Sequence, residues 1–295
     1  MKCTLCPREC GVDRHSKRGY CGASDKIVVS RTMLHMWEEP CISGTRGSGA
    51  IFFSGCNLRC VYCQNIDISH KINGEELDAR ALADKMLKLQ SQGAHNINLV
   101  TPTPYVMQIK EAIDMLRGAL KIPIVYNTSG YESVETIRAL DGYVDIFLCD
   151  IKYYDSALSL EYSGAEDYYE RAISALDEML KIAPNCTLDG DGIMTKGVIL
   201  RHLVLPSHRD DSIKILEDVC EKFDISRLRL SLMSQYTPDF YVGEIKALKR
   251  KITTFEYQCV TDRAIALGYD GYIQDRESAT KSYTPSFKKG DKNEA

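Results

Sequence analysis

We expect no secretion signal and no membrane span in the 295-residue sequence. Its first residues, MKCTLCPREC, contain no apolar stretch of the kind that a signal peptide requires. No run approaches the roughly 20 apolar residues that cross a bilayer. These absences predict a cytoplasmic protein without a membrane partner.

A basic excess is also missing, since the net charge is −4 at pH 7. Proteins that bind nucleic acids gather lysine and arginine on one face or along one helix. The short basic run RHSKR at 14–18 is more typical of a solvated loop than of a phosphate site. Nucleic acid is therefore not an expected partner.

Cysteine is unusually frequent, with 12 residues, of which eight lie before residue 64. Thiols in a reducing compartment stay free for metals or catalysis rather than forming disulfides. We therefore expect metal chemistry in the first quarter of the chain.

Short β-branched apolar runs alternate with segments of helical periodicity. The runs predict six buried strands, at 50–53, 96–100, 122–126, 143–149, 196–205 and 227–233. Apolar residues three or four apart predict helices at 77–86, 106–116, 134–140, 169–180, 213–219 and 242–252. Strand–helix units in series predict an α/β fold with parallel strands and right-handed crossovers. Six units are too few for a closed eight-stranded barrel, so an open doubly wound sheet and an incomplete barrel both fit.

Cysteines and polar residues follow four of these strands, where ligands of parallel α/β folds bind. They are Cys56, Cys60 and Cys63; Thr101 and Thr103; Asn127, Thr128 and Ser129; and Asp150 and Lys152. Thr103 is also expected to cap the helix at 106–116, with Pro104 at the first helical position.

Three cysteines lie within SGCNLRCVYCQN at 54–65, in the spacing C-x3-C-x2-C. Soft thiolates select iron–sulfur clusters, zinc or copper(I). A [4Fe–4S] cluster held entirely by protein uses four cysteines, so three leave one iron open for chemistry. The tight spacing just after a strand argues against three incidental buried cysteines.

The segment CNLRCVYC resembles the signature of the radical S-adenosylmethionine (SAM) superfamily. The resemblance implies a partial (β/α)6 barrel, a [4Fe–4S] cluster on Cys56, Cys60 and Cys63, and SAM at the open iron. In that superfamily the reduced cluster cleaves SAM to methionine and a 5′-deoxyadenosyl radical, which abstracts a hydrogen atom from the substrate. Tyr62 occupies a position at which an aromatic side chain packs near the adenine.

Residues 45–240 are similar, more narrowly, to the activating enzymes of glycyl-radical enzymes, such as pyruvate formate-lyase activase. The similar segments are YNTSGY at 126–131, DIK at 150–152 and ILRHLVLPS at 199–207. The strings EEPCISG, GSGAIFFSGCNLRC, NLVTPT and RHLVLP resemble an activase-like subgroup with an N-terminal cysteine extension. This likeness implies a glycyl-radical enzyme as partner and a flavodoxin or ferredoxin as electron donor. The SAM contacts that it implies are Asn127, Thr128, Asp150, Lys152 and Arg201.

Two positions depart from the activase pattern. TPTPY at 101–105 stands in place of a GGE-type turn that receives the SAM amino group, which leaves Thr101, Thr103 and backbone carbonyls as substitutes. Asn127 stands in place of an aspartate.

Structural roles stay open for three implied SAM contacts. Asp150 fits a cap for the following segment, Lys152 a loop lysine, and Arg201 an ion-pair partner inside the barrel. His202 follows Arg201 on the strand, so we expect it to point to the opposite face as a structural histidine.

Four further cysteines lie in C-x2-C-x3-C-x10-C spacing, at Cys3, Cys6, Cys10 and Cys21. Four thiolates satisfy a closed tetrahedral zinc site, and the same set fits an auxiliary [4Fe–4S] cluster. The sequence thus predicts three parts: a cysteine-rich metal-binding extension at 1–44, a barrel at 45–276 and a flexible tail at 277–295.

The expected activity is abstraction of a glycine hydrogen that activates a glycyl-radical enzyme. A second hypothesis keeps the radical chemistry but acts on a small molecule, a peptide or RNA. A third is a non-catalytic redox sensor holding iron–sulfur or zinc, which would leave SAM intact under reducing conditions. In the first two the cofactor carries the difficult chemistry, so no general acid or base is predicted.

Overall fold

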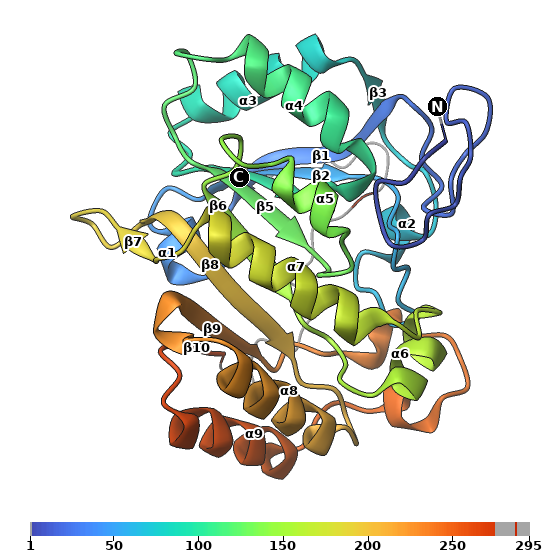
Figure 1. Ribbon diagram of the computed structural model, residues 1–295, viewed down its shortest axis with the longest axis vertical. Coiled ribbons are helices and arrows are strands. Elements are labelled where there is room, and N and C mark those ends of the chain that lie inside the picture. Colours follow the sequence, from blue (N-terminus) through green and yellow to red (C-terminus); the bar gives the residue numbers. More distant parts are fainter. Residues whose placement is uncertain (1, 275–286, 288–295) are drawn as a thin grey trace.

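The computed structural model describes residues 2–274 and residue 287, and its centre is a twisted sheet (Figure 1). The strands are β1 (Ile27–His35), β2 (Ser48–Phe53), β3 (Glu75–Leu77), β4 (Ile97–Val100), β5 (Ile124–Thr128), β6 (Ile146–Asp150), β7 (Thr187–Leu188), β8 (Met194–Leu203), β9 (Leu228–Met233) and β10 (Gly271–Ile273). In this part of the chain they form one ten-stranded sheet in the order β10-β9-β8-β6-β5-β4-β2-β1-β3, with β7 beside β8.

The six predicted strands correspond to β2, β4, β5, β6, β8 and β9. They are neighbours in that order, and every pair among them is parallel. All residues of β2 and β4 are buried, as expected of strands covered on both faces. The predicted α/β class is therefore confirmed, as a mostly parallel sheet. Among the described strands, β10 and β3 end the sheet without pairing to each other, so the sheet is open.

Helices connect successive parallel strands and cover the outer face of the sheet. The longer ones are α3 (Ala79–Ser91), α4 (Val106–Met115), α7 (Tyr168–Ile182), α8 (Arg209–Lys222) and α9 (Thr254–Leu267). The shorter ones are α1 (Pro40–Ser43), α2 (Ile66–Ser69), α5 (Val134–Arg138) and α6 (Ser156–Ser163). Figure 1 shows α7 lying across β6 and β8, which it contacts. No helix in residues 2–274 has both the length and the apolar character needed to cross a bilayer.

The inner face of the sheet has an apolar end and a polar end, because side chains of a strand alternate between faces. Near the amino ends of the strands, Val125, Ile146 and Ile199 pack against Cys41 and Ile42 of α1. Two residues further along β5 and β8, the inner face carries Asn127 and Arg201, which line a cavity. Helix α1 thus closes the apolar end, and the described residues leave a cavity at the polar end.

Strand β1 and helix α1 were not predicted from the sequence. Strand β1 is antiparallel to β2, with Thr32 opposite Ile51, and β3 is antiparallel to β1. Residues 27–35, which precede the predicted boundary at 44, therefore belong to the common sheet. The boundary itself stays a prediction. The predicted tail at 277–295 lies outside the described residues except for Phe287, whose ring centroid lies 5.5 Å from that of Phe52.

The predicted helix at 242–252 is wrong. This region contains one 3₁₀ turn, Lys246–Lys249, a second turn at Pro238–Phe240 precedes it, and the side chain of Val242 is 92% exposed. The helix begins later, at α9, with Thr253 as its N-cap. The hydroxyl of Thr253 accepts a hydrogen bond from the Glu256 amide, and the Glu256 carboxylate accepts one from the Thr253 amide. This capping box is a stronger start signal than the apolar spacing that precedes it.

The predicted cap of α4 is also wrong. Thr103–Tyr105 form a 3₁₀ turn, α4 begins at Val106, and no side chain caps it. The buried hydroxyl of Thr103 instead donates a hydrogen bond to Glu132, at 2.5 Å. The Thr103 hydroxyl, which the sequence pattern predicts to cap the helix, therefore binds the buried Glu132 carboxylate instead.

Candidate active site

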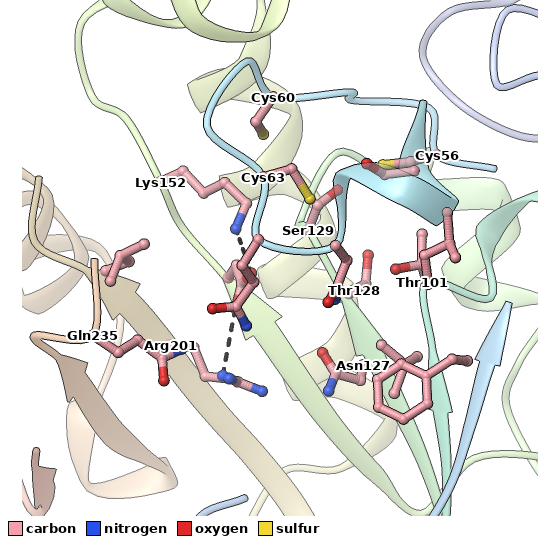
Figure 2. A pocket seen from close by; sticks show the side chains of 18 of the residues that line it. Cys56, Cys60, Cys63, Thr101, Asn127, Thr128, Ser129, Lys152, Arg201 and Gln235 are labelled. Atoms are coloured by element: carbon pink, nitrogen blue, oxygen red, sulfur yellow. Dashed lines mark hydrogen bonds and ion pairs between the residues drawn. The ribbon is translucent and has the colours of Figure 1, made fainter. Parts of the chain in front are cut away.

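A cavity of about 200 Å³ lies at the carboxyl ends of the parallel strands (Figure 2). It is lined by all the predicted cluster and SAM residues except Thr103, namely Cys56, Cys60, Tyr62, Cys63, Thr101, Asn127, Thr128, Asp150, Lys152 and Arg201. Residues that are distant in sequence meet here because each follows, or ends, a strand of one sheet. Ser129, which follows the third of these strands, also lines the cavity.

The three cysteines come from the loop that follows β2. Gly55 has a φ of +92°, and Leu58 is fully buried, so the loop turns back over the sheet and is anchored there. The Cys56 sulfur accepts hydrogen bonds from the amides of Leu58 and Arg59, at 3.4 and 3.5 Å. Burial raises the pKa of the Cys56 thiol to about 12, so a bound cation is needed to deprotonate it at neutral pH.

The arrangement of the thiols fits a cluster with one open iron. Figure 2 shows Cys56, Cys60 and Cys63 on one side of the cavity, with their sulfurs apart from one another. Within residues 2–274 and 287, no three His, Cys, Asp or Glu side chains already converge on a single ion. Thiolates of a [4Fe–4S] cluster bind separate irons, so they need not converge. In the described part of the chain, no fourth cysteine lines this cavity.

Two largely buried cations, Lys152 and Arg201, line the cavity together with the thiols. The Lys152 ammonium lies 2.5 Å from Oδ2 of Asp150, and the Arg201 Nε lies 3.6 Å from Oδ1 of the same carboxylate. Figure 2 shows both cationic side chains pointing into the cavity. Burial lowers the pKa of Lys152, but Asp150 and the nearby thiols raise it more, so the net shift is upward. Lys152 therefore stays charged.

Two glutamates that were not predicted, Glu38 and Glu39, lie beside Asp150, Lys152 and Arg201. These five side chains are here called the charged layer. Glu38 accepts a hydrogen bond from Arg201 Nη1 at 3.2 Å, and a Glu39 oxygen lies 3.3 Å from Arg201 Nε. The Asn98 side chain donates to Glu38 at 3.0 Å. These glutamates lie between β1 and α1, far in sequence from the cavity. In the sequence these glutamates are visible only as the acidic pair of EEPCISG. That pattern does not indicate that they pair with Arg201.

The structure bears on each alternative role. Asp150 does not cap the next helix, since Asp155 caps α6 by accepting from the Leu158 amide at 2.9 Å. Lys152 is not a solvated loop lysine, since its side chain is only 16% exposed. Arg201 does make the ion pairs expected of a structural role. His202 is buried outside the cavity and its ring contacts the Ile151 carbonyl at 2.6 Å.

Tyr62 is fixed at the edge of the cavity by other tyrosines. Its hydroxyl accepts a hydrogen bond from Tyr153 at 2.8 Å. The rings of Tyr153, Tyr162 and Tyr236 stand edge-on to it, at centroid distances of 6.0 to 6.4 Å. The ring therefore presents a preorganised apolar surface.

A buried carboxyl, Glu132, lies behind the cavity wall and was not predicted. It accepts hydrogen bonds from Thr128 on the cavity side and from Thr103 on the other. Burial raises the pKa of Glu132 to about 7, although these hydrogen bonds lower it. Thr103 does not line the large cavity and faces a second, smaller one, together with the four N-terminal cysteines. No sequence pattern marks Glu132, because its partners come from separate loops.

A model of the radical SAM superfamily matches residues 50–219, more than half of the chain. An uncharacterized protein of Methanocaldococcus jannaschii is 29% identical over 264 residues, which cover 87% of this chain and 72% of that protein. The pyruvate formate-lyase-activating enzyme of Clostridium pasteurianum is 27% identical over 169 residues, which cover 56% of this chain and 65% of the enzyme.

Solved structures share the fold at low identity. Streptococcus suis SuiB bound to the precursor peptide SuiA has a TM-score of 0.52 and 16% identity, over 76% of this chain and 48% of SuiB. The structure of anSMEcpe with bound AdoMet and a peptide has a TM-score of 0.50 and 13% identity, over 74% of this chain and 60% of that protein. The chain thus spans about half to three fifths of these solved proteins.

Proposed function

The chain belongs to the radical SAM superfamily, and we propose that it activates a glycyl-radical enzyme by abstracting a hydrogen atom from a backbone glycine. One observation carries the proposal: three cysteines of one loop share a cavity with the Asp150, Lys152 and Arg201 charges. The partial match to a pyruvate formate-lyase-activating enzyme favours a glycine of a partner protein as the substrate.

We expect Cys56, Cys60 and Cys63 to hold a [4Fe–4S] cluster. When bound, this cluster and SAM supply the electron and the 5′-deoxyadenosyl radical that takes the hydrogen atom. The contribution of the chain is to hold these groups, to orient them and to keep water away. A flavodoxin or a ferredoxin is the proposed electron donor.

The charged layer suits the amino-acid part of SAM. Lys152 and Arg201 offer cations to a carboxylate, and Asp150 can accept from an ammonium or a hydroxyl. Buried pairs of this kind hold their geometry before the ligand arrives, because moving one partner leaves the other charge uncompensated. Tyr62 offers an apolar face to the adenine.

Thr101 is the proposed replacement for the activase GGE-type turn. It follows β4, lines the cavity and has a φ of +59°. A β-branched residue in this left-handed region is strained, and such strain concentrates at ligand sites. The polar side chains of Asn127 and Thr128 lie on the next strand. The hydroxyls of Thr103 and Thr128 both donate to Glu132, but Thr103 is the weaker candidate because it does not line the cavity.

The test uses the full chain, purified and reconstituted without oxygen. Reduced protein with SAM should release 5′-deoxyadenosine, and a candidate glycyl-radical enzyme should then show a glycyl radical by spin resonance. Cys60→Ser should lose both signals. A partner with its radical glycine changed to alanine should lose the radical signal.

Each other result supports a rival hypothesis. Release of 5′-deoxyadenosine without a glycyl radical on any candidate enzyme favours a small molecule, a peptide or RNA as substrate. A bound cluster that leaves SAM intact favours the non-catalytic sensor.

A further inference from the structure

Residues 2–26, here called the N-terminal unit, fold without an apolar core. The unit precedes β1, and its regular pairing among the described residues is a single bridge between Lys2 and Asp13. From residue 2 onward, the first buried apolar side chain is that of Ala23. So short a segment rarely holds one conformation without a metal or a disulfide. Its four cysteines are free thiols.

Those four cysteines, Cys3, Cys6, Cys10 and Cys21, line one small cavity. A β-carbon placed on Gly19 would lie 3.4 Å from the Cys10 sulfur and 3.5 Å from the Cys21 sulfur, so both sulfurs border one point of the backbone. The turns that bring the cysteines together are fixed by backbone hydrogen bonds, such as that from the Glu9 amide to the Cys6 carbonyl at 3.0 Å. In the described residues the sulfurs do not converge on one point, so binding of a single ion requires these turns to move inward, which a cluster would not require.

The number of ligands favours a closed site. Four cysteines line the cavity of about 10 Å³, whereas three line the cavity of about 200 Å³ that also contains Asp150, Lys152 and Arg201. Zinc suits a closed set of four thiolates, because it takes tetrahedral sulfur ligands at about 2.3 Å and leaves no open position.

The N-terminal unit also grips the loop that carries the other three cysteines. Arg8 Nε donates to the Asn57 carbonyl at 2.9 Å, and Asn57 lies directly after Cys56 and lines the small cavity as well. In the opposite direction, Arg59 Nη1 donates to the Tyr20 carbonyl at 3.3 Å.

The two backbones approach closely at Gly55. A β-carbon on this glycine would lie 2.7 Å from the Cys21 carbonyl oxygen. The unit is fastened to the barrel as well, since the Leu5 carbonyl accepts from the hydroxyls of Ser133 and Thr136 at 3.2 and 2.7 Å. The unit therefore bridges the loop at 54–65 and the segment after β5.

We propose that Cys3, Cys6, Cys10 and Cys21 bind one zinc ion, and that this ion makes the N-terminal unit a clamp on the loop at 54–65. Without the ion the unit has no core, so its contacts with Asn57 and Arg59 loosen. The loop that holds the iron–sulfur cluster then opens more often. This proposal concerns metal content and cluster retention and does not depend on the substrate.

The first test measures zinc and iron in the full chain after anaerobic purification and reconstitution. We expect about one zinc and about four irons per chain. The double variant Cys3→Ser/Cys21→Ser should lose the zinc. The control Cys220→Ser/Cys259→Ser, which changes two partly buried cysteines outside both sites, should keep it. Iron near eight per chain, or zinc retained in the first variant, overturns the zinc site.

The second test measures how fast a chelator bleaches the cluster absorbance. Cys3→Ser/Cys21→Ser should lose the cluster about tenfold faster than the unchanged chain, the effect of losing one charged hydrogen bond. Arg8→Ala should do the same while it keeps its zinc, which separates loss of the clamp from loss of the fold. Arg80→Ala, at an exposed position on α3, is the control. Bleaching of Arg8→Ala at the unchanged rate overturns the clamp.

These measurements read metal content and cluster lifetime, not SAM cleavage. Failure of the clamp therefore leaves the proposed activity intact, and absence of SAM cleavage leaves the clamp intact.

Discussion

The Lys152 ammonium and the Asp150 carboxylate are held 2.5 Å apart, with less than a fifth of either side chain exposed. Asp150 ends β6 on the inner face of the sheet, and Lys152 lies two residues further along the same direction. Arg201 approaches the same carboxylate from the neighbouring strand, β8. One aspartate thus contacts two cations, of which Arg201 is also held by Glu38 and Glu39.

Replacing this aspartate should weaken SAM binding. In Asp150→Asn the two cations lose their shared counter-charge, and we expect the Kd for SAM to rise about 10- to 100-fold. Anaerobic calorimetry on the reconstituted protein measures it. Asp141→Asn, at an exposed turn, should bind SAM normally. An unchanged Kd in Asp150→Asn with the cluster intact would remove Asp150 from the SAM site.

Glu132 should make stability depend on pH. Its pKa is raised from an ordinary value of about 4.5 to about 7 in the fold, so between these values the folded chain binds more protons than the unfolded chain. The contribution of this group to the free energy of unfolding is full below pH 4.5 and is lost as the pH rises to about 7. The loss is up to about 3 kcal/mol.

Denaturant unfolding at pH 5.5 and pH 8 measures this loss. Glu132→Gln cannot ionise, so the difference between the two pH values should shrink. Glu135→Gln, at an exposed position three residues away on α5, should keep it. Equal pH dependence in all three proteins would show that Glu132 is ionised throughout.

Gly130 should tolerate no side chain. Its φ is +81°, and a β-carbon there would lie 2.2 Å from the Asp150 carbonyl oxygen. Gly130→Ala should lower the free energy of unfolding by about 3 kcal/mol, from overpacking and backbone strain together. Gly142→Ala is the matched control, because Gly142 has a φ of +76° but no atom within 4 Å of the added carbon. Equal losses in the two variants would mean that backbone strain alone matters.

Thr253 should stabilise α9 through its capping box. Thr253→Ala removes the acceptor of the Glu256 amide, and we expect a loss of about 1 kcal/mol in the free energy of unfolding. Denaturant midpoints measure it, with Glu221→Ala, exposed on the neighbouring helix α8, as the control. A Thr253→Ala midpoint equal to that of the control would show that α9 is held by packing alone.

Local sequence patterns were sufficient to predict the strands of the central sheet and most of the residues that line the cavity. A buried parallel strand is a continuous apolar run, so its signal lies within a few residues, as at 146–150. Residues such as Asp150 and Asn127 could then be grouped, because the carboxyl ends of parallel strands share one edge.

Features that depend on distant partners were missed. Glu38 reaches the cavity and Glu39 reaches Arg201 only because the segment before α1 lies over the sheet. Glu132 is buried by contacts with Thr103 and Thr128, which no short pattern joins. At 242–252, Leu248 and Ile252 are buried although the backbone there does not form an α-helix. Their spacing therefore matched a helical pattern without a helix.

The free ends of the sheet, at β10 and β3, bear on how a large substrate reaches the cluster. A complete barrel admits a ligand only through its mouth, which suits a compact molecule. A glycine inside a folded polypeptide is not at a chain end. It must therefore enter as part of a hairpin, through an opening in the side of the barrel. Among the described strands the wall is unclosed, so under the proposed function a hairpin of the partner enzyme would enter at this flank without unfolding.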